Sequence, residues 1–520
     1  KSERNFLLPT TSMRSSISSF KSSFWHLSFI IIVIVLLSVF VLQYLSTSSL
    51  STGFTFAASS VFSQFGNRSQ DALSALVQQG DRIERQLNGL REALSLMEAG
   101  AAKDIKDNST RNLSSPQSPK RRPQVAEIDC ARLIQGDDTY AASIASKRPL
   151  LADPPPDDVD FSCDGIRSRI LPPRNPDVGY PIAFVKLVYQ DYEFLEEQLA
   201  ATYARENVYC FASDKKSSLV FHRRMSALSS CLPNVYLSSD EYPLDSAGHF
   251  QDTAHIDCLR LLLKRKTAWK YAIFLQNNDI IMKTQFELAT IFGVLNGTSD
   301  AEITPCPGDR CTPKLERSLD KLGLCPKDME PEQSEVCRKA NIHWAKGATQ
   351  VSLARQTAEY ILERMNVTAL VKELNDMPFG VDEVLMESLL ATEELAIPGG
   401  FTFRCLPKRN HFISRHSIWY DEKSCGSRHM RHGICVYGVE DLQILSQHTS
   451  IMANKMLPSF DYAAIHCIAE MLYNRTIGSR KDGLDIKYYE NLEQVQYNRL
   501  INDKKLTPEK INCTVLGSFK

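Results

Sequence analysis

Residues 181–188 read PIAFVKLV, and this stretch decides the fold. Apart from Lys186 it is apolar, and its length and composition predict a β-strand. Further strands are predicted at residues 207–212, 234–237 and 271–275, and helices at residues 192–203 and 258–269. Strands that alternate with helices predict an α/β domain around a mainly parallel sheet.

Two acidic residues follow predicted strands of this sheet. Asp214 comes just after the second strand, and Asp279 comes shortly after the strand at residues 271–275. Ligands of open α/β sheets bind outside the carboxyl ends of the strands. We therefore expect the binding site at that edge.

The N-terminal region carries a membrane-anchor signal. Residues 24–45 contain no charged side chain, and about 20 apolar residues are enough to cross a bilayer as a helix. Four basic residues precede this segment against a single acid, so the positive-inside rule places residues 1–23 in the cytosol. A cleaved signal peptide is the alternative, but the apolar run is long for one and no clean cleavage site follows it. We predict a single-pass type II signal anchor at residues 24–45.

Residues 46–125 have the composition of a lumenal stem, which is rich in Ser and Thr and ends in a polar, Pro-containing linker. Within the stem, residues 73–97 space their apolar side chains three and four apart, with a defect at Gly80. This pattern favours a short coiled coil, through which the chain would form a homodimer. An amphipathic helix that lies on the globular body, residues 126–520, is the alternative.

Cysteines and sequons agree with a lumenal location for the body. All fourteen cysteines lie between Cys130 and Cys513, and an even number in an oxidising compartment predicts disulfides. A zinc site is disfavoured, because the sequence has no C-x2-C spacing. The net charge of −1 gives no indication of a nucleic-acid partner. Acceptor sequons for N-glycosylation occur at Asn67, Asn108, Asn112, Asn296, Asn366, Asn474 and Asn512.

Short segments spread over residues 128–476 carry a family resemblance. They are IDCARLIQGD (128–137), PIAFVKLV (181–188), YCFASDK (209–215), WKYAIFL (269–275), MKT (282–284), DEV (382–384), GICVYGVEDL (433–442) and ANK (453–455). No single segment is specific. Their order and the cysteine spacing together resemble the core-2/I-branching β-1,6-N-acetylglucosaminyltransferase family (glycosyltransferase family 14).

This resemblance implies a fold and a reaction. The fold is a variant of the GT-A type of nucleotide-sugar glycosyltransferases, with residues 126–520 as the catalytic domain of a Golgi membrane enzyme. The implied reaction is inverting transfer of N-acetylglucosamine from UDP-N-acetylglucosamine to a sugar 6-hydroxyl on O-glycans, without metal or other cofactor. The implied partners are the UDP-sugar donor, a glycoprotein or O-glycan acceptor and the membrane. Two alternatives stay open, a xylosyltransferase-type enzyme of the same family and a catalytically inactive glycan-binding scaffold.

Departing UDP develops negative charge, which most GT-A enzymes neutralise with a cation held by an Asp-x-Asp motif. The only such triplet is DVD at residues 158–160, in a Pro-rich stretch that we interpret as a solvated loop. NND at residues 277–279 stands at a strand end but lacks the first acid. Arg and Lys side chains must then stabilise the phosphates.

In the family, these cations are an Arg inside a short disulfide loop and a Lys in an Ala-Asn-Lys segment. Lys455 matches the Lys. The loop from Cys425 to Cys435 is one residue longer than the family pattern, so counting from Cys425 selects Arg431 and counting back from Cys435 selects His432. We choose Arg431, because a guanidinium is always charged and can bind phosphate at two points. With His432, the stabilisation would be weaker and pH-dependent.

The same resemblance implies the remaining site residues. Glu383 takes the position of the general base that removes the proton of the attacking hydroxyl, and its neighbour Asp382 is the alternative. Val188 and Asp214 match positions that contact uridine, although Asp214 also fits an ordinary turn. Acceptor contacts are implied at Glu302, Arg310 and Trp419.

Residues 305–340 depart strongly from the family and carry four additional cysteines. The family positions imply four disulfides, Cys130–Cys467, Cys163–Cys231, Cys210–Cys258 and Cys425–Cys435. Proximity in the sequence adds Cys306–Cys311 and Cys325–Cys337. Cys405 and Cys513 then remain.

Overall fold

The computed structural model describes residues 121–151, 159–171, 178–308, 310–311, 315–406, 410–478 and 483–502, together with residues 513 and 516. The predicted cytosolic tail, the anchor and residues 46–120 of the stem lie outside these ranges, as do the sequons at Asn67, Asn108, Asn112 and Asn512. Within the described ranges, no helix is both long and apolar enough to span a membrane.

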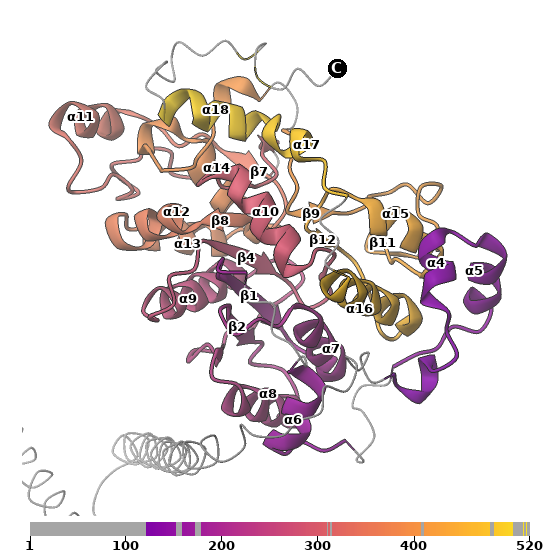
Figure 1. Cartoon of the computed structure of the whole chain (residues 1–520). Coiled ribbons are helices and arrows are strands. Elements are labelled where there is room, and N and C mark those ends of the chain that lie inside the picture. Colours follow the sequence, from indigo (N-terminus) through magenta and orange to yellow (C-terminus); the bar gives the residue numbers. More distant parts are fainter. Residues whose placement is uncertain are drawn as a thin grey trace, which may run out of the picture. The chain divides into compact units, whose positions relative to one another are not determined.

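A five-stranded sheet with the order β3-β2-β1-β4-β8 forms the centre of the domain (Figure 1). The first four of these strands are parallel, and β8 runs antiparallel to β4. The predicted α/β class and mainly parallel sheet are therefore confirmed. The strands are β1 (Ile182–Val188), β2 (Val208–Ser213), β3 (Val235–Leu237), β4 (Tyr271–Leu275) and β8 (Ser352–Ala354).

Alternate residues of β1 pack on opposite faces of the sheet, because successive side chains of a strand point to opposite sides. Ile182, Phe184 and Val188 belong to one apolar core, and Ala183, Val185 and Leu187 belong to another. The first core contains α7 (Tyr192–Thr202), α8 (Leu219–Cys231), α10 (Gln285–Leu295) and α16 (Tyr462–Ile477). The second contains α9 (Gln251–Leu263), α12 (Arg355–Glu359), α13 (Thr368–Asn375) and α14 (Leu385–Ala391).

The helix predicted at residues 258–269 was misplaced, since α9 spans Gln251–Leu263. The apolar run at residues 259–263 suggested the later start. The first turns of α9 are polar but buried, and Asp252 and His255 both lie in the interior. Three basic residues follow the helix from Lys264 onward, where positive charge is favourable to the C-terminal end of the helix dipole.

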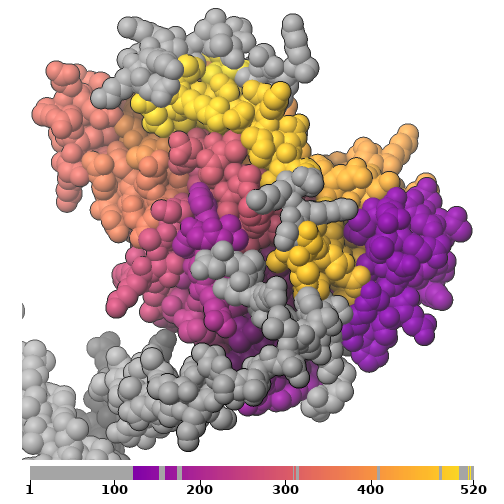
Figure 2. All heavy atoms as spheres, in the orientation of Figure 1, coloured from indigo at the N-terminus to yellow at the C-terminus, as the bar shows by residue number. Residues whose placement is uncertain are grey.

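The remaining elements surround this core, and Figure 2 shows α4 and α5 (indigo to purple) at one side and the segment around α11 (salmon) at the other. Residues 121–395 contribute η2 (Pro123–Val125), α4 (Cys130–Gln135), α5 (Asp138–Ala145), α6 (Cys163–Ile170), β5 (Ile280–Ile281), β6 (Thr304–Pro305), α11 (Pro331–Lys339), β7 (Ala345–Lys346), η3 (Tyr360–Arg364), η4 (Val381–Glu383) and η5 (Glu393–Leu395). The C-terminal part contributes η6 (Phe403–Cys405), β9 (Arg415–His416), β10 (Met430–Arg431), β11 (Ile434–Cys435), η7 (Val439–Asp441), α15 (Leu442–Gln447), β12 (Met452–Ala453), α17 (Ile486–Glu490) and α18 (Glu493–Asn502).

Seven disulfides join all fourteen cysteines. All four pairs implied by the family resemblance are present, as are the two predicted from proximity in the sequence. The seventh bond joins Cys405 to Cys513, the two cysteines that had remained. The sequon asparagines Asn296, Asn366 and Asn474 are exposed on the surface.

Candidate active site

The carboxyl ends of β1, β2 and β4 are tied together by hydrogen bonds at one edge of the sheet. The backbone N–H of Asp214, after β2, donates to the carbonyl of Val188 at the end of β1 (2.9 Å). Asn277, after β4, accepts at Oδ1 from the backbone N–H of Tyr189 (2.9 Å). Residues from three neighbouring strands therefore share the edge at which ligands of such sheets bind.

Both predicted uridine contacts are buried, although Asp214 keeps 12% of its side chain exposed. Its Oδ1 accepts the backbone N–H of Lys216 (2.9 Å), which is the turn that the sequence also allowed. Val188 exposes 0% of its surface, so in this conformation it supports Asp214 and offers no surface to a ligand. The residue exposed at the end of β1 is Tyr189.

Glu383 lies at the end of η4 with two cations on one of its oxygens. Its Oε2 accepts from Nη2 of Arg310 (2.7 Å) and lies 2.8 Å from Nζ of Lys346. The side chain remains 23% exposed. Asp382, the alternative base, is buried and accepts from Oγ1 of Thr349 (2.7 Å). Burial raises the pKa of Asp382 to about 6. Of the two carboxylates, Glu383 is the one more open to a substrate.

Arg310 is held against Glu383 by its surroundings. It lies in the loop closed by the Cys306–Cys311 disulfide, and its guanidinium is 4.6 Å from the centre of the Phe379 ring. Gly380 has a φ of +64°, and a Cβ there would collide with the Arg310 guanidinium. A larger residue at position 380 would therefore be strained by the positive φ and would displace the Arg310 guanidinium.

Glu302, the other predicted acceptor residue on this side, lies two residues before β6, whose antiparallel partner β7 carries Lys346. Its backbone carbonyl lies so close to Gly347 that no side chain fits at that position. Its charge is also among the influences that raise the pKa of the buried Glu387, after burial itself and Asp252 and Glu383. Glu302, Arg310 and Glu383 therefore belong to one side of the site.

Three cations converge on the other side. Burial, with the charges of Arg431 and Arg415, lowers the pKa of Lys455 from its usual value to about 8. The Lys455 carbonyl accepts the N–H of Tyr437 (3.0 Å), and its own N–H donates to the carbonyl of Cys435 (3.4 Å). The structure thus brings Lys455 together with the 425–435 loop that carries Arg431.

The 425–435 loop ends in a tight hairpin. Arg431 pairs with Ile434, and the two residues between them, His432 and Gly433, have φ values of +53° and +75°. A two-residue hairpin turn with both φ values positive is the type I′ turn, which suits the twist of paired strands. His432 therefore occupies the turn, while Arg431 lies on β10.

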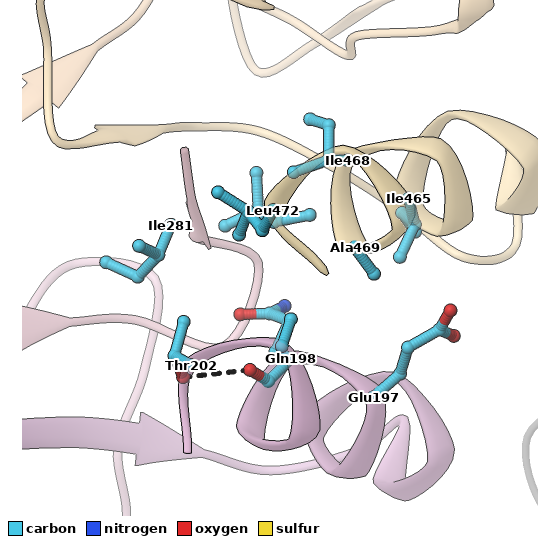
Figure 3. Close-up of a pocket in the computed structure, with 10 residues that line it drawn as sticks. Glu197, Gln198, Thr202, Ile281, Ile465, Ile468, Ala469 and Leu472 are labelled. Atoms are coloured by element: carbon cyan, nitrogen blue, oxygen red, sulfur yellow. Dashed lines mark hydrogen bonds between the residues drawn. The ribbon is translucent and has the colours of Figure 1, made fainter. Parts of the chain in front are cut away.

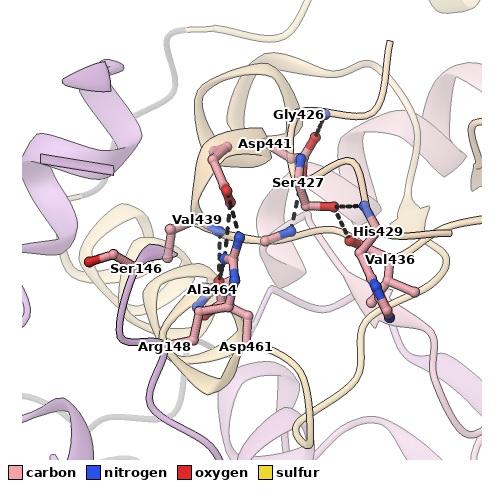
Figure 4. A network of polar contacts seen from close by, with 12 residues as sticks. Ser146, Arg148, Gly426, Ser427, His429, Val436, Val439, Asp441, Asp461 and Ala464 are labelled. Atoms are coloured by element: carbon pink, nitrogen blue, oxygen red, sulfur yellow. Dashed lines mark hydrogen bonds and ion pairs between the residues drawn. The ribbon is translucent and has the colours of Figure 1, made fainter. Parts of the chain in front are cut away.

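A buried carboxylate holds the base of this loop, and Figure 4 shows the network. Asp441 accepts backbone N–H groups of Gly426 (2.7 Å), Ser427 (3.2 Å) and Gly438 (2.9 Å). Oγ of Ser427 in turn donates to the carbonyl of Val436 (2.5 Å). These bonds fix both ends of the loop independently of any ligand.

Arg415 on β9 is the cation that sequence reasoning missed. Its Nη1 donates to Oε1 of Gln350 (2.8 Å) and its Nη2 to Oδ1 of Asn454 (3.1 Å). Its guanidinium is 5.5 Å from the centre of the Trp419 ring, which is 44% exposed. The predicted acceptor residue Trp419 therefore lies beside the cations, whereas Arg310 lies beside Glu383.

Two other features of the described residues are unsuited to chemistry. A cavity of about 10 Å³ between α7, β5 and α16 is lined mainly by Ile, Ala and Leu side chains (Figure 3). It has room for about one water molecule. The group Cys130, His466 and Glu470 has the spacing of a metal site, but the Cys130 sulfur is in a disulfide.

Comparison with known proteins assigns the domain. A family model described as Core-2/I-Branching enzyme matches residues 182–446, slightly more than half of the chain. The chain belongs to the core-2/I-branching enzyme family. Membership makes it a glycosyltransferase, and implies a nucleotide-sugar donor and a glycan acceptor.

Curated relatives agree with this assignment. Beta-1,3-galactosyl-O-glycosyl-glycoprotein beta-1,6-N-acetylglucosaminyltransferase 3 of Mus musculus is 25% identical over 385 residues, which cover 68% of this chain and 85% of the mouse protein. The protein of the same name from Ovis aries is 25% identical over 382 residues, covering 68% and 84%. A Beta-1,3-galactosyl-O-glycosyl-glycoprotein beta-1,6-N-acetylglucosaminyltransferase of Bovine herpesvirus 4 is 24% identical over 378 residues, with the same coverage.

Proposed function

We propose that this member of the core-2/I-branching family transfers N-acetylglucosamine from UDP-N-acetylglucosamine to a sugar 6-hydroxyl on O-glycans, with inversion, in a GT-A-like domain. The names of the relatives support the donor and the β-1,6 linkage. The observation that carries the proposal is the pairing of one accessible carboxylate, Glu383, with a cluster of three cations at the same sheet edge.

In this reaction Glu383 removes the proton of the acceptor hydroxyl as that oxygen attacks the sugar. Arg310 and Lys346 both contact Oε2, and Oε1 is the oxygen that would receive the proton. A carboxylate at hydrogen-bonding distance is the usual base for such an attack. Glu302, Arg310 and Trp419 contact the acceptor.

Arg431 and Lys455 stabilise the UDP diphosphate as it leaves, and Asp214, beside Val188, contacts the uridine. Charge-assisted hydrogen bonds from fixed cations act on charge that develops in the transition state. The proposed metal independence is supported by Asp279, whose carboxylate already accepts three N–H groups of the protein. Both oxygens of this carboxylate therefore bind groups of the protein itself and are not placed to hold a metal ion.

Residues 24–45 anchor the enzyme in the Golgi membrane as a type II protein, with the stem as a dimer contact through residues 73–97. The support is the uncharged apolar segment, and the exposed sequons Asn296, Asn366 and Asn474 agree with a lumenal domain.

A UDP-release assay of the secreted domain tests the function. Purified residues 112–520 are supplied with a panel of UDP-sugars and O-glycan acceptors, in EDTA. We expect turnover with UDP-N-acetylglucosamine alone among the donors. Turnover with UDP-xylose would establish the xylosyltransferase alternative. Glycan binding without turnover of any donor would establish the inactive scaffold, and a strict need for manganese would contradict the cationic mechanism.

A further inference from the structure

Asp279 is a wholly buried carboxylate at the edge of the site, and the proposed chemistry does not use it. It exposes 0% of its surface. Its Oδ2 accepts from the backbone N–H of Gln276 (2.6 Å) and from Nε2 of Gln350 (2.8 Å). Its Oδ1 accepts from Nδ2 of Asn454 (2.7 Å). A buried carboxylate is tolerated only with such compensation, because leaving it without partners is costly.

One of these bonds leads to the phosphate-binding cations. Asn454 directly precedes Lys455, and its Oδ1 accepts from Arg415. Arg415 also donates to Gln350, which itself donates to Asp279. Asp279, Asn454, Arg415 and Gln350 thus close a ring of hydrogen bonds beneath Lys455.

The other bonds lead to the segment that carries the base. Gln350 donates through Nε2 to Oε1 of Gln276 (3.0 Å), and Gln276 donates to Oδ2 of Asp382 (3.3 Å). Asp382 is the residue before Glu383. The carboxylate of Asp279 is therefore the point at which the two sides of the site are connected.

We propose that Asp279 is a positioning residue for glycosyl transfer, which holds Asn454 so that the Lys455 ammonium faces the leaving diphosphate and keeps the Asp382–Glu383 segment in register with it. The inference rests on the proposed function of Lys455 and Glu383. It places the acid of the incomplete NND triplet at residues 277–279 in a supporting role.

Electrostatics agree with this geometry. The charged groups that face Lys455 are Arg431 on β10, Arg415 on β9 and Asp279 after β4. Burial and the two arginines lower the pKa of Lys455, and Asp279 acts in the opposite direction. Loss of the Asp279 charge therefore shifts deprotonation of Lys455 to lower pH.

The test is calorimetric binding of UDP to the secreted domain between pH 6.5 and 9.5, in a cycle of wild type, Asp279→Asn, Lys455→Met and the double variant. In Asp279→Asn the new side-chain amide would face an N–H donor, so we expect the Kd for UDP to rise about tenfold. The alkaline midpoint of binding should move to lower pH. Because Asp279 acts through Lys455, Asp279→Asn should raise the Kd for UDP by less than about twofold when Lys455 is already replaced by Met.

Asn207→Asp is the matched control. Asn207 is equally buried and has several hydrogen bonds, including one from the N–H of Ile182, but lies at the opposite edge of the sheet. The Asn207→Asp variant should be less stable than wild type but should keep both its UDP affinity and its pH midpoint of binding. If Asp279→Asn does not fold, Asn454→Ala keeps the buried carboxylate but removes its bond to the Lys455 segment, together with the bond from Arg415, and should weaken UDP binding in the same way.

Three outcomes would overturn the inference. Wild-type affinity with an unchanged pH midpoint in Asp279→Asn is one, and an equal loss in both backgrounds is another. Unchanged UDP affinity in Asn454→Ala is the third. All three leave the proposed function standing, whereas failure of the wild-type domain to bind UDP would overturn the proposed function and this inference together.

Discussion

Two short disulfide loops place one arginine each at opposite sides of the site, and they are held in different ways. The 425–435 loop, with Arg431, is fixed at its base by three backbone N–H groups that donate to the buried Asp441. The 306–311 loop has a backbone bond from the N–H of Cys306 to the carbonyl of Trp344 (3.2 Å), but its Arg310 side chain is held by the ion pair to Glu383 and by the exposed ring of Phe379.

The two loops therefore differ in what holds them. The loop with Arg431 is fixed by its own backbone bonds, whereas the Arg310 side chain depends on Glu383, the proposed base. Backbone bonds to a buried acid do not depend on a ligand, so the backbone that carries Arg431 is in place before the donor binds. The position of Arg310 depends on the carboxylate of Glu383, so binding of an acceptor and release of this ion pair are coupled. Variants on the two sides should therefore have different kinetic effects.

The largest effect is expected on the side of the base. Glu383→Gln keeps the size of the side chain but removes its capacity to accept a proton, so kcat should fall by about 10²–10⁴. The Kd for UDP should change by less than twofold, because the proposed role of Glu383 concerns the acceptor and not the UDP. Steady-state turnover and calorimetry measure the two quantities. Near-normal turnover would assign the base to another carboxylate, with Asp382 as the first candidate.

A smaller effect, of a different kind, is expected on the side of the cations. Arg431→Ala removes the proposed charge-assisted contact to the diphosphate, so UDP affinity and kcat/KM should each fall about tenfold. His432→Ala is the matched control, since His432 occupies the turn and not the strand, and it should bind UDP within twofold of wild type. The reverse order of effects would mean that His432 binds the phosphates.

The 425–435 loop shows what could be predicted from sequence. Its cysteines, Arg431 and the Ala-Asn-Lys segment are local motifs, so the family resemblance located them. The choice between Arg431 and His432 could not be settled, because it depends on a type I′ turn with a non-glycine residue at positive φ. Such a turn leaves only a weak signal in the sequence.

The arrangement around Glu383 could not be predicted in the same way, because it depends on contacts between residues that are distant in the sequence. Arg310 and Glu383 are 73 residues apart, and Lys346 and Arg415 stand in short strands without a motif. Their meeting is a consequence of tertiary packing, which one sequence does not display. Tertiary packing also explains why the predicted bounds of α9 were wrong, because its first turns are polar in sequence and buried in the fold.

The coupling of Arg310 to the base gives the next prediction. Arg310→Ala should raise the KM for the acceptor by about three- to tenfold while the Kd for UDP stays unchanged, because a charge-assisted contact is lost on that side only. Arg310→Lys should restore part of the loss, since a cation would again reach Oε2. A change in UDP affinity equal to that in acceptor KM would contradict the division of the site into two sides.

An effect of another kind, on stability and not on activity, concerns the buried acids Asp382 and Asp441. Burial raises the pKa of Asp382 from 3.8 to about 6, so its contribution to stability is full below about pH 4 and is lost as pH rises through 6. The accumulated loss at pH 7 is about 3 kcal/mol. Asp382→Asn does not ionise, so its Tm should fall less than that of wild type between pH 4 and 7, by a few degrees. Asp441→Asn should instead lower the Tm throughout this range, because its amide would oppose backbone N–H donors that now bond to the carboxylate. Parallel pH profiles for wild type and Asp382→Asn would show that this acid keeps an ordinary pKa in the folded protein.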